Sequence, residues 1–400
     1  MPSRRLAVLK RATSSSSNLR TGDTNDPSFD LRREVAKFDA NIPVEAATTP
    51  PSTWFTRPEF HQLEVHTVFH DAWMFAGRVD QITKPGKFFT GTIGKEPYIV
   101  LRDENNELKA FYNVCRHHAM QIVNDTEGTV KDLQCPYHGW TYALSGRLKK
   151  ATRLRGIKNF SARNFGLIPM MVKAWGPLIF IRPNKISEEK DNFFEDLESL
   201  KNRLDGIGFS SGMKFMKRIT YTLNCNWKVF VDNYLDGGYH VSTAHKDLSV
   251  ALDASSYRTA VHEWHSIQSV SAVGSEERVC GDAIYAHIFP NLMINRYGPW
   301  IDTNVALPLT HNTCMIVFDY FLEEDYIQQK SEEDLQNILD TSFTASDKVQ
   351  QEDIFLCEGV QRGLESSAYD LGRYAPGVEF ADHMFHVKLA ELFRRHLKIP

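Results

Sequence analysis

The stretch Cys115-Arg116-His117, followed after seventeen residues by Cys135-Pro136-Tyr137-His138, decides the fold of this 400-residue chain. Each half supplies one thiolate and one imidazole. Four such ligands can hold a [2Fe–2S] cluster, with two Cys on one iron and two His on the other. They can also hold a structural zinc ion, which accepts two Cys and two His at similar spacings. The pattern therefore predicts a metal centre built from two loops.

The order of the ligands favours the iron–sulfur cluster over zinc. Zinc sites more often group like ligands, as CxxC followed by HxxxH, whereas each loop here contributes one Cys and one His. The motif resembles the Rieske signature CxH…CxxH, and Cys135–Trp140 reads CPYHGW. This resemblance implies a Rieske [2Fe–2S] cluster, and hence a redox protein, with four ligands: Cys115, His117, Cys135 and His138.

Composition restricts the remaining possibilities. With 42% hydrophobic residues in 400, the chain can build two domains. A net charge of −4 offers no basic excess for nucleic acid, and we expect no membrane span because no apolar run reaches about 20 residues. Six Cys occur, at positions 115, 135, 225, 280, 314 and 357. The four outside the motif lack the spacing of a disulfide scaffold, which indicates a reducing compartment.

The N-terminus has the composition of an organellar transit peptide. The first 22 residues contain no Asp or Glu, five Lys or Arg, and the run Ser14–Ser17. A disordered basic tail is the alternative. We expect an organellar location, with the chloroplast stroma favoured over the mitochondrion or the cytoplasm. Residues 23–52 are largely polar and end near Pro50-Pro51, so 1–52 is predicted to be a targeting or disordered extension.

Periodicity divides the rest of the chain into two domains. Helical spacing over 54–75 precedes short alternating or apolar runs at 87–93, 97–102, 108–114, 140–144 and 175–181. These runs predict an all-β cluster domain, which with its preceding helix covers 53–182. Residues 183–210 are acidic and helical in character, and strands are expected at 218–223, 283–289, 292–296, 303–308 and 314–322. A helix over 331–361 completes an α+β domain, residues 183–400, with an antiparallel sheet and flanking helices.

A second metal site is indicated by His240 and His245. Non-haem Fe(II) that activates O₂ takes two His and one carboxylate on one face, leaving the other face open. Five residues apart on an ideal helix, the two rings point roughly 140° away from each other. A helix break or a π-bulge between them would let both reach one iron; two unrelated histidines are the alternative.

The surrounding residues resemble a known family. The string Asn226-Trp227-Lys228…Asp232-Asn233…Asp236…His240-x4-His245 is similar to the iron-binding helix of the Rieske-type ring-hydroxylating oxygenases. The resemblance implies mononuclear Fe(II) held by His240, His245 and a downstream Asp. Asp353 is the best match for that Asp, and Glu352 is the alternative. Catalytic roles are implied for Asp236 and Asn233.

Asp236 departs from the family pattern by one position. The family carboxylate often stands three residues before the first iron His, where this chain has Gly237. A side chain four residues before His240 lies on the same helix face, so Asp236 can still contact that imidazole; Asp232 is the second choice. In the family this carboxylate links to a cluster His of a neighbouring subunit, which implies a homotrimer or another ring-shaped homo-oligomer.

Two further stretches, Asp232–Lys246 and Tyr285–Trp300, resemble the plant choline monooxygenases. This implies oxidation of a quaternary amine, choline, to betaine aldehyde hydrate in glycine betaine biosynthesis, with O₂ and reduced ferredoxin or a reductase. N-demethylation of glycine betaine, carnitine or a related amine is the alternative within the family. A Rieske electron carrier without oxygenase activity is the alternative from another class.

A quaternary ammonium group has no N–H to donate, so proteins hold it against aromatic faces. Four aromatic residues near the strands are candidates for this substrate site, and Trp300, after a Gly-Pro turn, is favoured among them: Tyr285, Phe289, Tyr297 and Trp300. Aromatic residues on strands can equally be core residues.

Overall fold

The computed structural model describes residues 29–183, 191–206, 208–210, 212–273 and 282–399, and residues from Leu31 onward form one compact unit. The predicted targeting segment up to residue 28 lies outside the described residues. Residues 31–52, predicted to belong to a targeting or disordered extension, are instead folded and include a helix, α1 (Leu31–Ala36). Val35 and Phe38 are buried, and the Phe38 ring packs against His386 of the C-terminal helix. Burial of these two side chains explains why the segment is folded.

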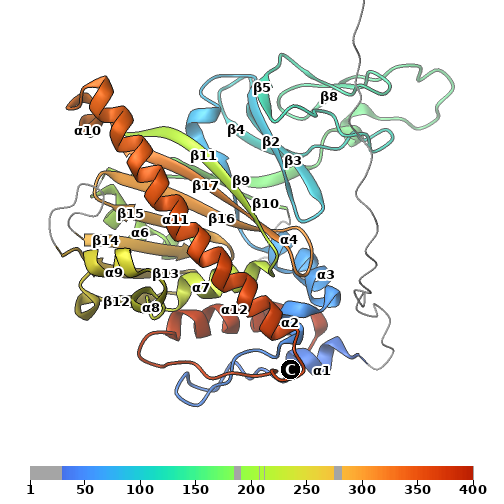
Figure 1. Cartoon of the computed structure of the whole chain (residues 1–400). Helices are drawn as coiled ribbons and strands as arrows, with labels where there is room; N and C mark the ends of the chain where they lie inside the picture. The colour runs from blue at the N-terminus through green and yellow to red at the C-terminus, as the bar shows by residue number, and fades with distance from the viewer. Residues whose placement is uncertain (1–28, 184–190, 207, 211, 274–281, 400) are drawn as a thin grey trace, which may run out of the picture. The chain divides into compact units, whose positions relative to one another are not determined.

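The cluster domain is built on a seven-stranded antiparallel sheet in the order β1-β10-β9-β4-β3-β2-β5 (Figure 1). Its strands are β1 (Met74–Arg78), β2 (Lys87–Ile93), β3 (Glu96–Arg102), β4 (Leu108–Tyr112), β5 (Glu127–Thr129), β9 (Pro169–Trp175) and β10 (Leu178–Arg182). A small sheet carries the second cluster loop: β6 (Leu133–Gln134), β7 (Thr141–Tyr142) and β8 (Leu148–Lys150). The all-β prediction for this domain is confirmed.

The second sheet is also antiparallel and has seven strands, in the order β11-β17-β16-β15-β14-β13-β12. Its strands are β11 (Met213–Leu223), β12 (Arg258–Val261), β13 (His265–Ser271), β14 (Asp282–Ile288), β15 (Leu292–Tyr297), β16 (Trp300–Pro308) and β17 (Cys314–Glu323). Alternation assigns the two faces. Ile284, Ile294 and Ile301 lie in a hydrophobic core shared with Phe180 of β10, whereas the intervening residues face helices. The α+β prediction is confirmed.

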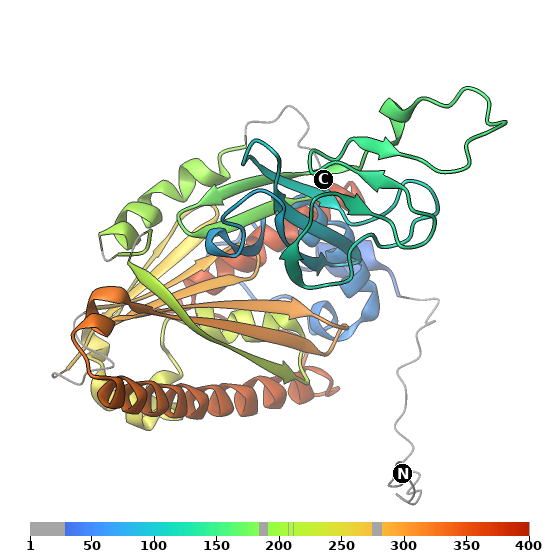
Figure 2. The same ribbon diagram turned by 90° about the horizontal axis from the view of Figure 1, so that it is seen from above.

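Helices cover the face of this sheet that carries the intervening residues. Figures 1 and 2 show α11 (Glu332–Leu364) running along it. Ser331 caps the start of this helix: its hydroxyl accepts a hydrogen bond from Asp334 N. The acidic first turn of the helix suits the helix dipole. The remaining helices are α2 (Thr53–Thr56), α3 (Pro58–His66), α4 (Val68–Asp71), α5 (Phe193–Asp196), α6 (Glu198–Asp205), α7 (Trp227–Leu235), α8 (Val241–Ala244), α9 (Lys246–Ala251), α10 (Glu324–Gln328) and α12 (Phe380–Leu397), with short 3₁₀ turns η1 (Val79–Gln81), η2 (Ala162–Phe165) and η3 (Ala254–Ser256).

Two predictions of local structure need correction. The helix expected over 54–75 is three short helices, because Pro58 starts a new one and Phe75 already belongs to β1. These helices contact elements of the second half: Trp54 packs on Phe393, and Glu64 accepts a hydrogen bond from the Trp227 indole.

Helix α12 was not predicted, because its buried positions include polar residues such as His386 that dilute the apolar pattern. Among the described residues, no helix is both long and apolar enough to cross a membrane.

Candidate metal centres and substrate cavity

The two cluster loops share one backbone design. In the first loop Ala119 N donates to Cys115 O at 3.0 Å, and in the second Gly139 N donates to Cys135 O at 3.0 Å. The residue four after each Cys has a positive φ, 57° at Ala119 and 69° at Gly139. Each loop therefore turns back on itself in the same way and presents its Cys and His together.

The sulfur atoms are buried and the imidazole rings are exposed. Cys115 and Cys135 belong to the hydrophobic core of the cluster domain, while the rings of His117 and His138 reach the surface with their centroids 4.7 Å apart. The hydroxyl of Tyr142 lies 3.2 Å from Cys115 Sγ. All four predicted cluster ligands are thus brought together on one side of the domain.

Trp140 provides a test of whether the site formed by the two cluster loops, called the cluster cradle below, fits a cluster. Its ring stacks on His117 at 4.8 Å, and its indole Nε1 is buried with no acceptor among the described residues. A buried donor without a partner is rare in a finished protein interior. The unused donor and the hydroxyl beside Cys115 suit a centre with sulfur acceptors, because hydrogen bonds to the sulfurs are among the factors that tune such clusters.

The predicted break in the iron-binding helix is a left-handed glycine pair, not a π-bulge. Helix α7 ends at Leu235, Asp236 follows as its C-cap, and Gly237 and Gly238 have φ values of 70° and 76°. A Cβ on Gly237 would stand 2.4 Å from Val378 O, and one on Gly238 would stand 2.6 Å from the Tyr257 ring. Only glycine fits both positions, and the chain then re-enters a short helix, α8.

His240 and His245 flank α8 at its two ends, so each ring leaves the helix axis in its own direction. Their Nε2 atoms lie 3.1 Å apart, and Asp353 Oδ1 on α11 lies 3.0 Å from His245 Nε2 and 3.7 Å from His240 Nε2. Metal bonds of about 2.1 Å place neighbouring ligand atoms about 3 Å apart at right angles. The three predicted ligands therefore fit one ion in the two-His, one-carboxylate arrangement.

Both iron-site histidines have a carboxylate on their outer nitrogen. Asp236 Oδ2 lies 2.5 Å from His240 Nδ1, and Glu352 Oε2 lies 2.7 Å from His245 Nδ1. Glu352, the alternative ligand, thus lies behind His245 instead of joining the triad. Such partners fix the tautomer and orientation of a ligating imidazole. Burial opposes protonation of His245, but Asp353 and Glu352 raise its pKa to about 9.

Asp232 lies in a separate buried cluster. Its Oδ1 is 3.2 Å from His386 Nε2, and Asp382 lies on the other side of the same ring. Burial raises the pKa of Asp232 to about 8. Asp236, and not Asp232, is therefore the carboxylate that contacts the imidazole of His240.

A cavity of about 140 Å³ opens beside the triad. Its wall includes Asp236, His240, His245 and Asp353, together with the predicted catalytic residue Asn233. The other lining side chains with rings or amides are Phe230, Tyr234, Tyr257, Tyr285, Asn295, Asn304 and Gln350. The volume is below the roughly 300–1,000 Å³ of cavities that take drug-sized ligands, so this site suits a small molecule.

Of the four aromatic residues predicted for the substrate, only Tyr285 lines this cavity. Trp300 shares the sheet face of Asn304 but lies four residues, or about 13 Å, away along β16, and it packs on Phe343 of α11. Tyr297 donates to Asp302 behind the wall, and Phe289 packs on Phe385. The expectation is therefore corrected: the aromatic character of these residues did not show where each lies along its strand, and three of the four lie outside the cavity wall.

Sequence reasoning missed the residues that shape the far wall. Tyr234 donates to Asn295 Oδ1 at 2.8 Å, and Asn295 and Asn304 both donate to the buried carboxylate of Asp302, at 2.8 and 2.6 Å. Tyr257 donates to Gln268 at 2.6 Å. The usable signal was the polar residues at alternate positions of otherwise apolar strands, Asp302 and Asn304, because a buried polar side chain needs a reason to be there.

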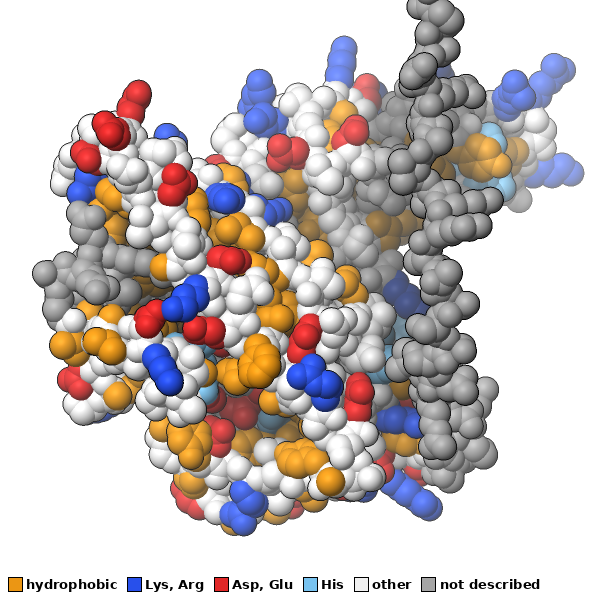
Figure 3. All heavy atoms as spheres, viewed as in Figure 1, with side chains coloured by type: hydrophobic (Ala, Val, Ile, Leu, Met, Phe, Trp, Pro, Cys, Tyr) orange, Lys and Arg blue, Asp and Glu red, His pale blue; other side chains and the backbone are white. Residues whose placement is uncertain are grey.

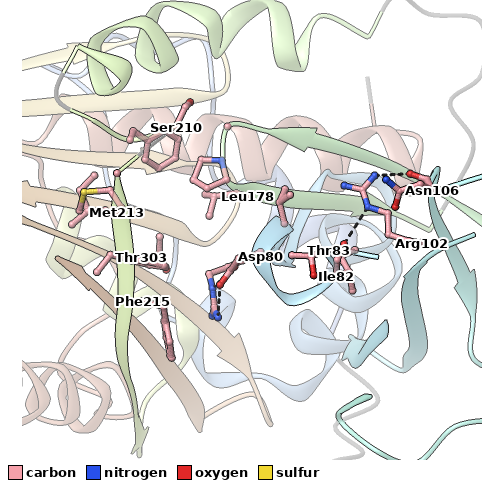
Figure 4. Close-up of a pocket in the computed structure, with 18 residues that line it drawn as sticks. Asp80, Ile82, Thr83, Arg102, Asn106, Leu178, Ser210, Met213, Phe215 and Thr303 are labelled. Atoms are coloured by element: carbon pink, nitrogen blue, oxygen red, sulfur yellow. Dashed lines mark hydrogen bonds and ion pairs between the residues drawn. The ribbon is translucent and has the colours of Figure 1, made fainter. Parts of the chain in front are cut away.

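A larger cavity, of about 490 Å³, lies away from both metal centres (Figure 4). It is lined by residues such as Arg102, Met213 and Phe215, and Arg102 donates to the carbonyls of Ile82 and Asn106. None of the predicted site residues lines it. Size alone therefore does not locate the chemistry of this protein.

The two halves of the chain match two family models. Residues 72–161 match the Rieske [2Fe–2S] domain, and residues 211–394 match the catalytic domain of the ring-hydroxylating alpha subunit. With the cluster cradle and the His–His–Asp triad on separate elements of one chain, this protein belongs to the Rieske non-haem iron oxygenases. The cofactors of that family are a Rieske [2Fe–2S] cluster and a mononuclear iron, and the cradle and the triad fit them.

Particular relatives narrow the family further. The chain is 46% identical to the chloroplastic choline monooxygenase of Arabidopsis thaliana over 90% of its own length and 86% of that protein. It is 39% identical to the chloroplastic choline monooxygenase of Beta vulgaris over 92% of its length and 82% of that protein. A solved quaternary ammonium Rieske monooxygenase, described in connection with carnitine oxidation and inter-subunit electron transfer, superposes with a TM-score of 0.77 at 24% identity, covering 89% of this chain and 98% of that one.

Proposed function

We propose that this enzyme hydroxylates choline to betaine aldehyde hydrate, the step that opens glycine betaine biosynthesis. One atom of O₂ enters a C–H bond of choline, and the other leaves as water with two electrons and two protons. Support comes from the plant relatives, whose names specify choline, and from the character of the cavity beside the triad.

The charge of the cavity wall is the observation that carries the choice of substrate. Among the described lining residues there is no Lys or Arg, and the two carboxylates of the wall are already engaged, Asp236 by His240 and Asp353 by the triad. Choline is a cation without a carboxylate. Carnitine and glycine betaine each carry a carboxylate, which a site without a cationic partner desolvates at a cost. N-demethylation of these two amines is therefore the weaker candidate.

The far wall offers further support for a cation. Tyr234, Tyr257 and Tyr285 provide aromatic surface of the kind that holds quaternary ammonium groups. Burial raises the pKa of Tyr234 and Tyr257, so both phenols stay neutral. Behind them, Asp302 is 2% exposed and accepts hydrogen bonds from Asn295, Asn304 and Tyr297, which favours its charged form. The three tyrosines and the Asp302 carboxylate behind them therefore replace Trp300 as our principal candidates for substrate selection.

The protein's own residues prepare the iron site. A ferrous ion held by His240, His245 and Asp353 would supply the activation of O₂. Asp236 and Glu352 keep a proton on the outer Nδ1 atoms and leave the Nε2 atoms free as ligands. Asn233 lies in the same wall as a candidate for orienting substrate or O₂.

We further propose a homotrimer or another ring in which the cluster of one subunit approaches Asp236 of the next. Asp236 is partly exposed, and its neighbour Tyr239 is 63% exposed. Inter-subunit electron transfer is described for the solved quaternary ammonium Rieske monooxygenase. Reduced ferredoxin is the proposed electron donor. The chloroplast stroma is the proposed location, in keeping with the chloroplastic names of the plant relatives.

Product analysis tests the proposal. Anaerobically reconstituted, chemically reduced protein is given O₂ with choline, glycine betaine or carnitine, one at a time. Betaine aldehyde from choline alone is the expected result. Formaldehyde release would instead establish an N-demethylase, and no O₂ consumption with any amine, with one cluster and no mononuclear iron, would leave only a Rieske electron carrier.

The Asp302→Asn variant tests the role of the buried charge separately. Loss of the negative charge is expected to raise the KM for choline about tenfold with little change in kcat. Asp80→Asn, at a carboxylate lining the larger cavity of Figure 4, is the matched control and should leave the KM unchanged. An unchanged KM in Asp302→Asn would contradict the role given to this charge.

A further inference from the structure

The segment that follows β8 is fastened to the cluster loops. Thr152 donates its hydroxyl to the carbonyl of His138 at 2.7 Å. Further along, Phe160 and Phe165 stack on each other at 4.8 Å, and both rings pack edge-on against Trp140, which itself stacks on His117. Figures 1 and 2 show the segment extending outward from β8. Residues 153–159 therefore form a loop whose two ends are held against the cluster ligands.

The charge of this part of the chain is one-sided. Residues 133–183 contain nine Lys or Arg and no Asp or Glu, although the whole chain has a net charge of −4. Seven of these cations fall between residues 147 and 163. Figure 3 shows Lys and Arg side chains around hydrophobic and His side chains in the upper right of the molecule. The positive charge is thus concentrated beside the cluster site.

Most of these cations are not used inside the fold. Lys149 pairs with Asp132 at 2.6 Å. Six further cations of this stretch are exposed and form no ion pair with a described residue: Arg147, Lys150, Arg153, Arg155, Lys158 and Arg163. Like charges at close range repel each other, so keeping six of them without acids destabilises the fold slightly. Such a surface indicates a partner that supplies the missing negative charge.

Exposed apolar side chains lie among the charges. Ile157 at the loop is 54% exposed, Tyr137 beside His138 is 63% exposed, and Met120 in the first cluster loop is 37% exposed. A few apolar contacts within a charged rim are typical of short-lived complexes, whose interfaces are small and whose encounter is steered by charge.

We propose that the loop at residues 153–159, with the flanking cations, docks an acidic one-electron carrier protein such as a ferredoxin. The inference rests on the proposed function, which requires an external electron donor, and assigns that donor an entry face. In each encounter the carrier is oxidised by one electron and the docked protein is reduced by one, and no bond is formed or broken.

The test reverses two charges at the loop. The double variant Arg155→Glu/Lys158→Glu changes side chains that are exposed and make no described contact. Its control, Arg203→Glu/Lys214→Glu, makes the same charge change at exposed residues of α6 and β11. The probe is a reduced plant-type [2Fe–2S] ferredoxin of negative net charge. Equilibrium binding and the rate of cluster reduction are measured anaerobically without amine, at low and high salt.

We expect the loop variant to bind the ferredoxin at least tenfold more weakly and to be reduced at least tenfold more slowly at low salt. The deficit should shrink as salt screens the charges, the control should behave like the wild type, and dithionite should reduce all three proteins equally. Wild-type binding in the loop variant would overturn the proposal. So would dissociation of the native oligomer in the loop variant alone, because the loop would then be a contact between copies. Failure of choline turnover would not affect this test.

Discussion

The cluster loops and the iron segment hold metal ligands in opposite ways. At the cluster, two loops whose cysteines are 20 residues apart repeat one backbone turn, bury their sulfurs and expose both imidazole rings. At the iron site, His240 and Asp353 are 113 residues apart, and the triad depends on a helix broken at two glycines and on a second helix, α11, lying across it.

The difference shows how far each site depends on the rest of the molecule. The cluster cradle is local, because a loop and its own hydrogen bonds define it. The iron triad exists only when α7 and α11 pack on the same face of the sheet. Damage to the packing should therefore remove iron before it removes the cluster.

The largest expected effect comes from removing one iron ligand. His240→Ala should abolish turnover, a loss of at least about 10³-fold, because the two remaining ligands bind the ion weakly. The visible spectrum of the cluster should be unchanged. Metal analysis and absorption spectra check both statements, and loss of iron and cluster together would show that the two regions are not independent.

A substitution at the glycine break tests the backbone turn without changing any metal ligand. Gly237→Ala should lose iron and destabilise the fold by about 2 kcal/mol or more, because its Cβ meets Val378 O and its φ is positive. Gly363→Ala on α11, where nothing lies within 4 Å, is the control and should stabilise slightly. Denaturant titration and iron content distinguish the two variants; equal behaviour would contradict the need for the break.

Acid sensitivity should arise in the catalytic half. Burial lowers the pKa of His287 to about 4, from 6.5. A lowered folded-state pKa means that the unfolded chain binds the extra proton first, so stability is complete above pH 6.5 and falls as pH drops towards 4. The loss is roughly 3 kcal/mol. His287→Gln should remove this part of the slope in denaturation measured at several pH values, and His66→Gln, at an exposed residue, should not. Equal slopes in wild type and His287→Gln would exclude this group.

A smaller effect is expected from Glu352, which contacts His245 on the nitrogen that faces away from the triad. Glu352→Gln should weaken iron binding about 10- to 100-fold, because the carboxylate orients His245 and favours its ligating tautomer. Competition with a chelator measures the affinity. Glu333→Gln, at an exposed position in the first turn of the same helix, is the control. If both variants hold iron equally, the contact has no role in binding.

The smallest effect is expected at the cluster. Tyr142→Phe removes the hydroxyl 3.2 Å from Cys115 Sγ, and a hydrogen bond of about 1 kcal/mol to sulfur corresponds to about 40 mV for one electron. The reduction potential should fall by that amount, because the bond favours the more negative reduced form. Tyr98→Phe, whose hydroxyl donates to Ala76 O, is the control and should leave the potential unchanged.

Sequence reasoning reached the fold class because strand alternation and helical spacing can be followed in neighbouring residues. It reached the enzyme family and its cofactors because the ligand motifs resemble those of a known family. It failed where a residue's role depends on position along an element. Trp300 shares the correct sheet face but lies too far along β16, and the residues of α12 alternate between apolar and buried polar positions. The periodicity of apolar residues indicates which face of a helix or strand is buried, but not which residues of other elements pack against that face.

By itself the sequence determined the two pairs of cluster ligands, because each pair lies within one loop and needs only that loop's turn. It also determined which histidines and late carboxylates were candidates for iron. Only the tertiary structure decided that Asp353 faces the two histidines while Glu352 stands behind one of them. Only the tertiary structure placed Asp302 behind its hydrogen-bonded neighbours Asn295 and Asn304 at the cavity wall beside the triad, which has no described Lys or Arg. Both depend on packing between distant elements, where a rotation of one residue along α11 exchanges the ligand for its neighbour.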